Sequence, residues 1–316
     1  MPDAGYWDVR ATRYGHTGWS DWVIYPFDQC ARLAAMRAVT GVLVPGRNGR
    51  ALDYGSGTGD FALMLSKRYQ HVIGIDISSK VLEIARKRYA RRRNITFLHA
   101  DAELGLSAAP VDFVLTVTVL NHIMDDSSLR ATIEHLTGIL APGGCFVALE
   151  SCTAVKSETR SNYQRNHTHD EWKAMFERCG LVLEDCFGFY HPTADRCQTF
   201  DRYARSLPVR LLRRIGHTPV TARALGAVAA LYLLGRRDYF WRAKPTDALR
   251  LMIFRKPVAS RLHSAPVREG AAMPAEAMQT PCACARTQEL TDARPACEAS
   301  RSPATDRAAT RPPGFF

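Results

Sequence analysis

Short apolar runs alternate with helical patterns between residues 45 and 190. Six runs rich in β-branched and aromatic residues predict strands: RALDYG (50–55), HVIGID (71–76), ITFLHA (95–100), VDFVLTVTVL (111–120), GCFVALES (144–151) and LVLEDCFGFY (181–190). The segments between them, such as DFALMLSKRY and SSKVLEIARKRYARR, carry apolar residues every three or four positions. This alternation is typical of a parallel sheet covered by helices on both faces.

A seventh run, DALRLMIFRKP (247–257), predicts a strand that returns late and closes the sheet beside the fifth strand, antiparallel to the rest. The predicted fold is therefore α/β, a Rossmann-like doubly wound sheet of seven strands, mostly parallel. Local chemistry marks several helix ends. Ser78 or Ser79, and then Asp126 or Ser127, are suited to cap helices, and Thr168 with Glu171 forms an S/T-x-x-E capping box.

The same patterns divide the chain into five parts. Residues 1–44 hold an aromatic lead-in and a helix from about Tyr25 to Thr40, and residues 45–190 form the core. Residues 191–246 are a basic insertion with helical stretches, and 247–257 are the last strand. Residues 258–316 are rich in Ala, Pro, Ser, Thr and Arg without a hydrophobic period, which predicts a disordered tail.

Composition is that of an ordinary soluble protein, with 46% hydrophobic residues over 316. No leader is seen, and the longest apolar runs are about half the roughly 20 residues that span a bilayer, so we expect a cytoplasmic location. The nine cysteines include no C-x-x-C pair, which predicts neither a disulfide framework nor a metal site. The formal charge of +11 is concentrated between Asp201 and Lys244, where ten Lys/Arg face two acids.

Three glycines follow the first predicted strand in LDYGSGTGD (52–60). A triphosphate loop needs a Lys followed by Ser or Thr after the glycines, and none follows here. The dinucleotide fingerprint G-x-G-x-x-G has a third glycine where this chain has Asp60, whose charge would repel a diphosphate at a helix start. The loop therefore favours a ligand that is zwitterionic or cationic.

Acids stand at the carboxyl ends of three successive predicted strands. Asp53 suits a nearby ammonium or sulfonium, Asp76 can accept from ribose hydroxyls, and Asp101 can accept from the exocyclic amine of adenine. Each alone could be a cap or turn former. Together with the glycine loop they predict a pocket for a nucleoside without phosphates, at the switch point of an open sheet.

These residues resemble the class I S-adenosylmethionine-dependent methyltransferases, in the small-molecule branch. The similar motifs are LDYGSGTGD (52–60), VIGIDISSKVLEIAR (72–86), ITFLHADAE (95–103), DFVLTVTVLNHI (112–123) and LTGILAPGGCFVALES (136–151). The resemblance implies S-adenosylmethionine as the cofactor. It assigns Asp53, Gly55, Ser56, Gly57, Thr58 and Gly59 to the methionine part, Asp76 and Ile77 to the ribose, Asp101 and Ala102 to the adenine, and Val119 and Leu120 to a segment, up to His122, that closes over the sulfonium.

The acceptor side is less constrained by the sequence. His122 is a usable base at neutral pH, or else shapes the pocket wall. Tyr14, Trp19 and Tyr25 are candidates for an aromatic lid, and Asn121 for an acceptor contact. The basic insertion suggests an acceptor with a carboxylate or phosphate, or an anionic surface, unless it is simply a solvated helical face.

We expect methyl transfer to an O, N or S atom of a small molecule, such as an amino acid, including S-methylation of a thioether, or a specialised metabolite. The alternatives are a lipid-like acceptor, a nucleic acid, a nicotinamide-dependent oxidoreductase and a non-catalytic cofactor-binding protein. Nucleic acid is disfavoured because TVLNHI stands where exocyclic-amine methyltransferases carry a proline-proline-aromatic motif. The sequence does not address the oligomeric state.

Overall fold

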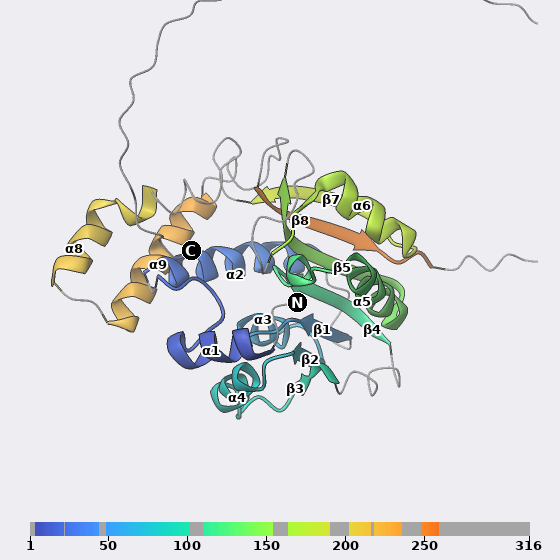
Figure 1. Cartoon of the computed structure of the whole chain (residues 1–316), viewed down its shortest axis with the longest axis horizontal. Coiled ribbons are helices and arrows are strands. Elements are labelled where there is room, and N and C mark those ends of the chain that lie inside the picture. The colour runs from blue at the N-terminus through green and yellow to red at the C-terminus, as the bar shows by residue number, and fades with distance from the viewer. Residues whose placement is uncertain are drawn as a thin grey trace, which may run out of the picture. The chain divides into compact units, whose positions relative to one another are not determined.

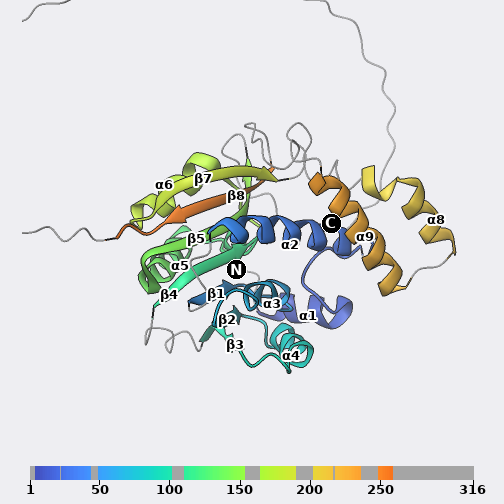
Figure 2. The same cartoon turned by 180° about the vertical axis from the view of Figure 1, so that it is seen from behind.

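The protein is described by a computed structural model that covers residues 4–21, 23–43, 49–101, 110–153, 164–189, 202–215, 218–235 and 248–258. Within these residues one mixed sheet runs through the molecule, with helices on both of its sides (Figures 1 and 2).

The main path of the sheet has the order β3-β2-β1-β4-β5-β8-β7. Its strands are β1 (Arg50–Tyr54), β2 (His71–Asp76), β3 (Ile95–His99), β4 (Val111–Val117), β5 (Leu140–Thr153), β7 (Val182–Phe189) and β8 (Ala248–Arg255). β8 runs antiparallel to both β5 and β7, and the other pairs are parallel. The predicted fold class is confirmed. The sheet has eight strands rather than seven, because the two-residue β6 (His167–Thr168) pairs with β5.

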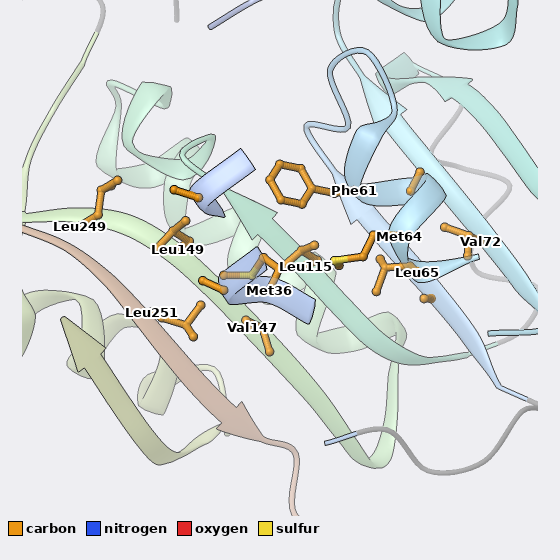
Figure 3. Packing of buried hydrophobic residues seen from close by; sticks show 14 of the residues in the cluster. Met36, Phe61, Met64, Leu65, Val72, Leu115, Val147, Leu149, Leu249 and Leu251 are labelled. Atoms are coloured by element: carbon orange, nitrogen blue, oxygen red, sulfur yellow. The ribbon is translucent and has the colours of Figure 1, made fainter. Parts of the chain in front are cut away.

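Successive residues of the central strands point to opposite faces, and each face carries its own apolar core. Phe113 and Leu115 of β4 pack on one side, and Val114 packs on the other. The first face is covered by α2 (Ile24–Leu43), α3 (Asp60–Leu65) and α4 (Ser79–Arg88), the second by α5 (Asp126–Ile139) and α6 (His169–Arg178). Figure 3 shows the first core, where Met36, Met64 and Leu115 meet between helix and sheet.

Helix caps follow the local chemistry with one correction. The Ser78 Oγ accepts from the Val81 N–H at the start of α4, and Thr168 and Glu171 form the complete capping box of α6. The prediction of Asp126 or Ser127 as the cap of α5 was wrong, since the side chain of Asp125 accepts from the Ser128 N–H. Asp125 lies directly before Asp126 and has the extended backbone that a cap requires.

The N-terminal lead-in and the stretch predicted as an insertion contain helices besides α2, and the sequence predicted them only in part. The lead-in holds a helix, α1 (Ala4–Tyr14), that was not predicted. The stretch predicted as the insertion contains α8 (Leu207–Ile215) and α9 (Pro219–Gly235). No described helix is long and apolar enough to cross a membrane. The predicted disordered tail lies outside the described residues, apart from Val258.

Candidate functional site at the carboxyl ends of the strands

The glycine loop joins β1 to α3, and its backbone requires glycine at three positions. Gly55, Gly57 and Gly59 have φ values of 72°, 52° and 83°, a region that other residues rarely adopt. A Cβ on Gly55 would lie 2.4 Å from the Val119 side chain, and one on Gly59 would lie 2.7 Å from the Phe97 ring. The missing side chains therefore let the loop approach the segment after β4 and the surface of β3.

Asp76, at the end of β2, holds this loop in place. Its carboxylate accepts from the Gly57 N–H at 2.9 Å and from the Ser78 N–H at 3.0 Å. Burial raises the pKa of Asp76, while these hydrogen bonds act in the opposite direction. Ile77 follows, and its carbonyl oxygen lies 2.9 Å from the Nε2 atom of His99. The structural role of Asp76 is to hold the glycine loop through these hydrogen bonds. A ribose contact at Asp76 stays a prediction.

Asp53 is buried beneath the loop with only 1% of its surface exposed. Burial raises the pKa of its carboxyl to about 8, and the nearby Asp76 and Asp60 carboxylates act in the same direction. Among the described residues, its Oδ2 atom finds no hydrogen-bond donor, and the same holds for Ser56 Oγ and Asn121 Oδ1. Buried polar atoms are normally satisfied, so this set fits a ligand that brings its own donors, such as an ammonium or hydroxyl group.

Asp60 is held by neighbours of the helix that it begins. Its carboxylate accepts from the Tyr89 hydroxyl at 2.7 Å and lies 3.4 Å from the Arg88 guanidinium. Thr58 donates to the same carboxylate at 3.3 Å and forms a side-chain hydrogen bond with Tyr25. Arg88 thus partly compensates the negative charge of Asp60 at the start of α3.

The segment after β4 turns sharply and is held by a carboxylate from β5. Thr118 has a φ of 52°, the one positive value at a non-glycine position of the described chain. The side chain of Glu150 accepts from the N–H groups of Val119, Leu120 and Asn121 at 3.2–3.4 Å. Glu150 is fully buried, which raises its pKa to about 7 against the effect of these hydrogen bonds.

Glu150 was not predicted to belong to the site. The available signal was an acid inside the apolar run CFVALES, because a buried strand rarely carries a charge without a structural partner. Its partners are the N–H groups at the start of the short 3-10 helix η2 (Leu120–His122). The Leu120 side chain is fully buried in the second core. A cofactor contact at this position stays a prediction, and it concerns the residues around Leu120 rather than the Leu120 side chain.

A buried ion pair ties α2 to the same turn. The Arg32 guanidinium lies 2.8 Å from the Asp28 carboxylate and donates to the Thr118 hydroxyl at 2.8 Å. The Trp19 indole N–H donates to Asp28 at 3.1 Å. Trp19 is thus connected to the residue after β4 through the side chains of Asp28 and Arg32. These contacts position the lead-in, and they do not depend on an acceptor contact by Trp19.

α1 contacts both sides of the site. The Trp7 ring meets His122 edge to face with 4.9 Å between ring centroids, and Asp8 accepts from the Ser78 hydroxyl and from the Lys80 N–H at the start of α4. Both views show α1 beside α4 (Figures 1 and 2). His122, the predicted base, is therefore half-buried at the end of η2, against α1.

The other aromatic lid candidates form a stack beside the glycine loop. The His16 ring lies parallel to Tyr25 with 3.5 Å between ring centroids, and the Tyr14 ring centroid lies 6.0 Å from that of His16. Burial lowers the pKa of His16 to about 4, and the nearby Arg10 acts in the same direction. The His16 imidazole is therefore neutral near pH 7, and the structure brings Tyr25 to the loop through Thr58.

Asp101 lies at the edge of the described site. Its side chain is 94% exposed and 3.2 Å from the Nδ1 atom of His99. Ala102 lies outside the described residues. The adenine contact of both residues stays a prediction.

Comparisons with known proteins agree with this geometry. Residues 51–144 match the family described as methyltransferase domain. A Staphylococcus saprophyticus protein named demethylmenaquinone methyltransferase is 35% identical over 191 residues, which cover 58% of this chain and 77% of that protein. A Clavibacter sepedonicus protein of the same name is 32% identical over 137 residues, 43% of this chain and 53% of that protein.

The solved structures resemble the chain more distantly. The N-methyltransferase NodS from Bradyrhizobium japonicum, in complex with S-adenosyl-l-homocysteine, is 16% identical with a TM-score of 0.46. The superposition covers 73% of this chain and 86% of that one. A likeness at this level carries no functional weight.

Proposed function

The chain belongs to the class I S-adenosylmethionine-dependent methyltransferases, and from this premise we propose that it methylates a small aromatic acceptor of the quinol class. It is an enzyme, and its cofactor is S-adenosylmethionine. When bound, that cofactor supplies a methyl group activated by a positively charged sulfur. The residues of this chain would bind the cofactor and the acceptor, orient them, and take a proton from the acceptor.

The residues around the glycine loop fit the cofactor because they offer buried oxygen atoms that can accept hydrogen bonds. The unsatisfied Asp53 and Ser56 oxygens would receive donors from its amino-acid end, and Asp76 would receive the ribose hydroxyls. A buried carboxylate with a raised pKa is also stabilised in its charged form by a nearby cation, which the ammonium or sulfonium would provide. Together with the glycine loop and Asp60, these acceptors distinguish the site from one built for a diphosphate.

The observation that carries the acceptor proposal is the extent of the match to the Staphylococcus saprophyticus protein. Its 191 residues exceed the 94 residues of the family match at 51–144, so the likeness extends beyond the methyltransferase domain motifs. The name of that relative describes methylation of a quinone. The amino-acid and thioether acceptors expected from sequence receive no support from these names.

The local surroundings of His122 suit an aromatic acceptor with an acidic hydroxyl. Trp7 provides an apolar ring beside the imidazole, and aromatic rings pack favourably edge to face. In the proposed reaction, His122 would take the proton of the acceptor hydroxyl, which makes the neighbouring ring carbon nucleophilic. That carbon would receive the methyl group and then lose its own hydrogen as a proton, which restores the aromatic ring. The Glu150 contacts hold η2 and thereby orient the imidazole.

The test supplies the purified protein with S-adenosylmethionine carrying a deuterated methyl group and three acceptor types: a demethylated naphthoquinol, a catechol and an amino acid. We expect a labelled product from the naphthoquinol by mass spectrometry. A His122→Ala variant should lose most turnover while its cofactor Kd, measured by calorimetry, stays within about twofold. Labelled amino acid without labelled quinol would refute the acceptor proposal, and an unchanged kcat in His122→Ala would refute the proton role.

A further inference from the structure

α9 packs against α2 with its small residues inward. Ala222, Gly226 and Ala230 are buried at intervals of four residues. A Cβ on Gly226 would lie 2.7 Å from the backbone nitrogen of Phe27 and 2.9 Å from the carbonyl carbon of Pro26. The two helix backbones therefore approach closely at Gly226, where there is no room for a side chain.

Three large apolar residues of α9 lie on its solvent-exposed side, whereas Leu225 packs against the first core. Val220, Val228 and Leu231 are 76%, 65% and 65% exposed. In an ordinary surface helix such bulky residues face the core. Exposed apolar area of this kind is unfavourable in water and marks interaction sites when it forms a contiguous stripe.

α8 repeats the arrangement. Leu207, Leu211 and Ile215, spaced four residues apart, are 66%, 47% and 80% exposed, whereas Val209 is fully buried. Both views show α8 beyond α9, on the side away from the sheet (Figures 1 and 2). Two neighbouring helices thus each present an apolar stripe to solvent.

Arginines accompany both stripes. Arg210 and Arg214 follow the edge of the α8 stripe, and Arg223 follows that of α9, all three exposed. The described residues 202–215 and 218–235 contain six arginines and no acid. One of the six, Arg213, is held by Asp21 at 2.7 Å.

We propose that the α8 and α9 stripes bind the surface of an anionic lipid bilayer. Apolar stripes bordered by arginines are the pattern of helices that lie in a bilayer interface, where bulky side chains enter the acyl boundary and guanidinium groups reach phosphates. A second copy of the chain is a poorer occupant, because face-to-face pairing would bring two sets of arginines together. The inference does not depend on which acceptor is methylated.

The experiment measures co-sedimentation of the whole protein with phosphatidylglycerol vesicles and, separately, with phosphatidylcholine vesicles, without cofactor or acceptor. We expect binding to the anionic vesicles that weakens as salt is raised. Arg210→Gln with Arg214→Gln should weaken it roughly 20-fold, since each basic residue at such a surface contributes about a fivefold gain. Leu211→Ser with Ile215→Ser should weaken it at least about tenfold.

Two controls separate surface binding from unfolding and from self-association. Val182→Ser changes a residue that is 53% exposed at the start of β7 and should leave vesicle binding unchanged. Thermal unfolding should be similar in all variants, since the replaced side chains are exposed. Equal binding to both vesicle types, binding unaffected by either double variant, or a dimer in solution that the Leu211→Ser, Ile215→Ser variant dissociates would overturn the proposal.

Discussion

Replacing Glu150 with glutamine should change how stability depends on pH. Glu150 is fully buried, and its pKa is raised from 4.5 to about 7. Between these values the unfolded chain is ionised at this position while the folded protein keeps the proton. The folded state therefore binds more protons, and stability falls as pH rises through 7. Glutamine cannot ionise, so the variant should lose this part of the pH dependence.

The magnitude follows from the two pKa values. A shift of one pKa unit corresponds to about 1.4 kcal/mol, and integration between about pH 5 and about pH 8 gives about 2.5 kcal/mol for Glu150. Asp53, with its pKa raised to about 8, lowers stability over the same window in both proteins. The difference between wild type and Glu150→Gln therefore isolates Glu150.

Urea unfolding at the two pH values measures the effect. Wild type should lose about 2.5 kcal/mol more than Glu150→Gln on going from about pH 5 to about pH 8. Glu134→Gln, on the exposed side of α5, is the matched control and should follow the wild type. Equal losses in wild type and Glu150→Gln would refute the assignment of a protonated carboxyl beneath η2.

Further variants test the glycine loop and the packing of α9. Asp76→Ala should raise the cofactor Kd by at least about tenfold in calorimetry, because the carboxylate holds the Gly57 N–H at 2.9 Å. An unchanged Kd would exclude that role. Gly226→Ala should lower the free energy of unfolding, since the new Cβ meets the α2 backbone, whereas Gly138→Ala, with open space in α5, should raise it by about 0.5–1 kcal/mol. Equal effects in chemical denaturation would contradict the close packing.

Much of the sheet could be predicted from local patterns. The strands of a parallel sheet are buried on both faces, so they appear as short apolar runs whatever surrounds them. The order of the runs also predicted that the last strand would return antiparallel beside the fifth, and β8 pairs with β5 in this way. The cap of α5 was misassigned by one residue, because neighbouring Asp and Ser residues offer equivalent oxygens and only the backbone selects among them.

The helix α1 and the role of Glu150 could not be predicted in the same way. α1 has Trp7 against His122 and Asp8 against Ser78, contacts with residues that are far away in sequence. Glu150 meets its three N–H donors across neighbouring strands. These contacts produce no periodic pattern in the sequence, because they depend on which elements become neighbours in the folded protein.

The sequence by itself determined the glycine loop and the acids at the strand ends, because each rests on a few consecutive residues whose backbone and charge requirements are local. The tertiary structure alone decided that Asp60 is compensated by Arg88, that His122 lies against Trp7, and that α9 turns its small residues inward against α2. These outcomes depend on distances between elements, which are set when the two apolar cores close around the sheet.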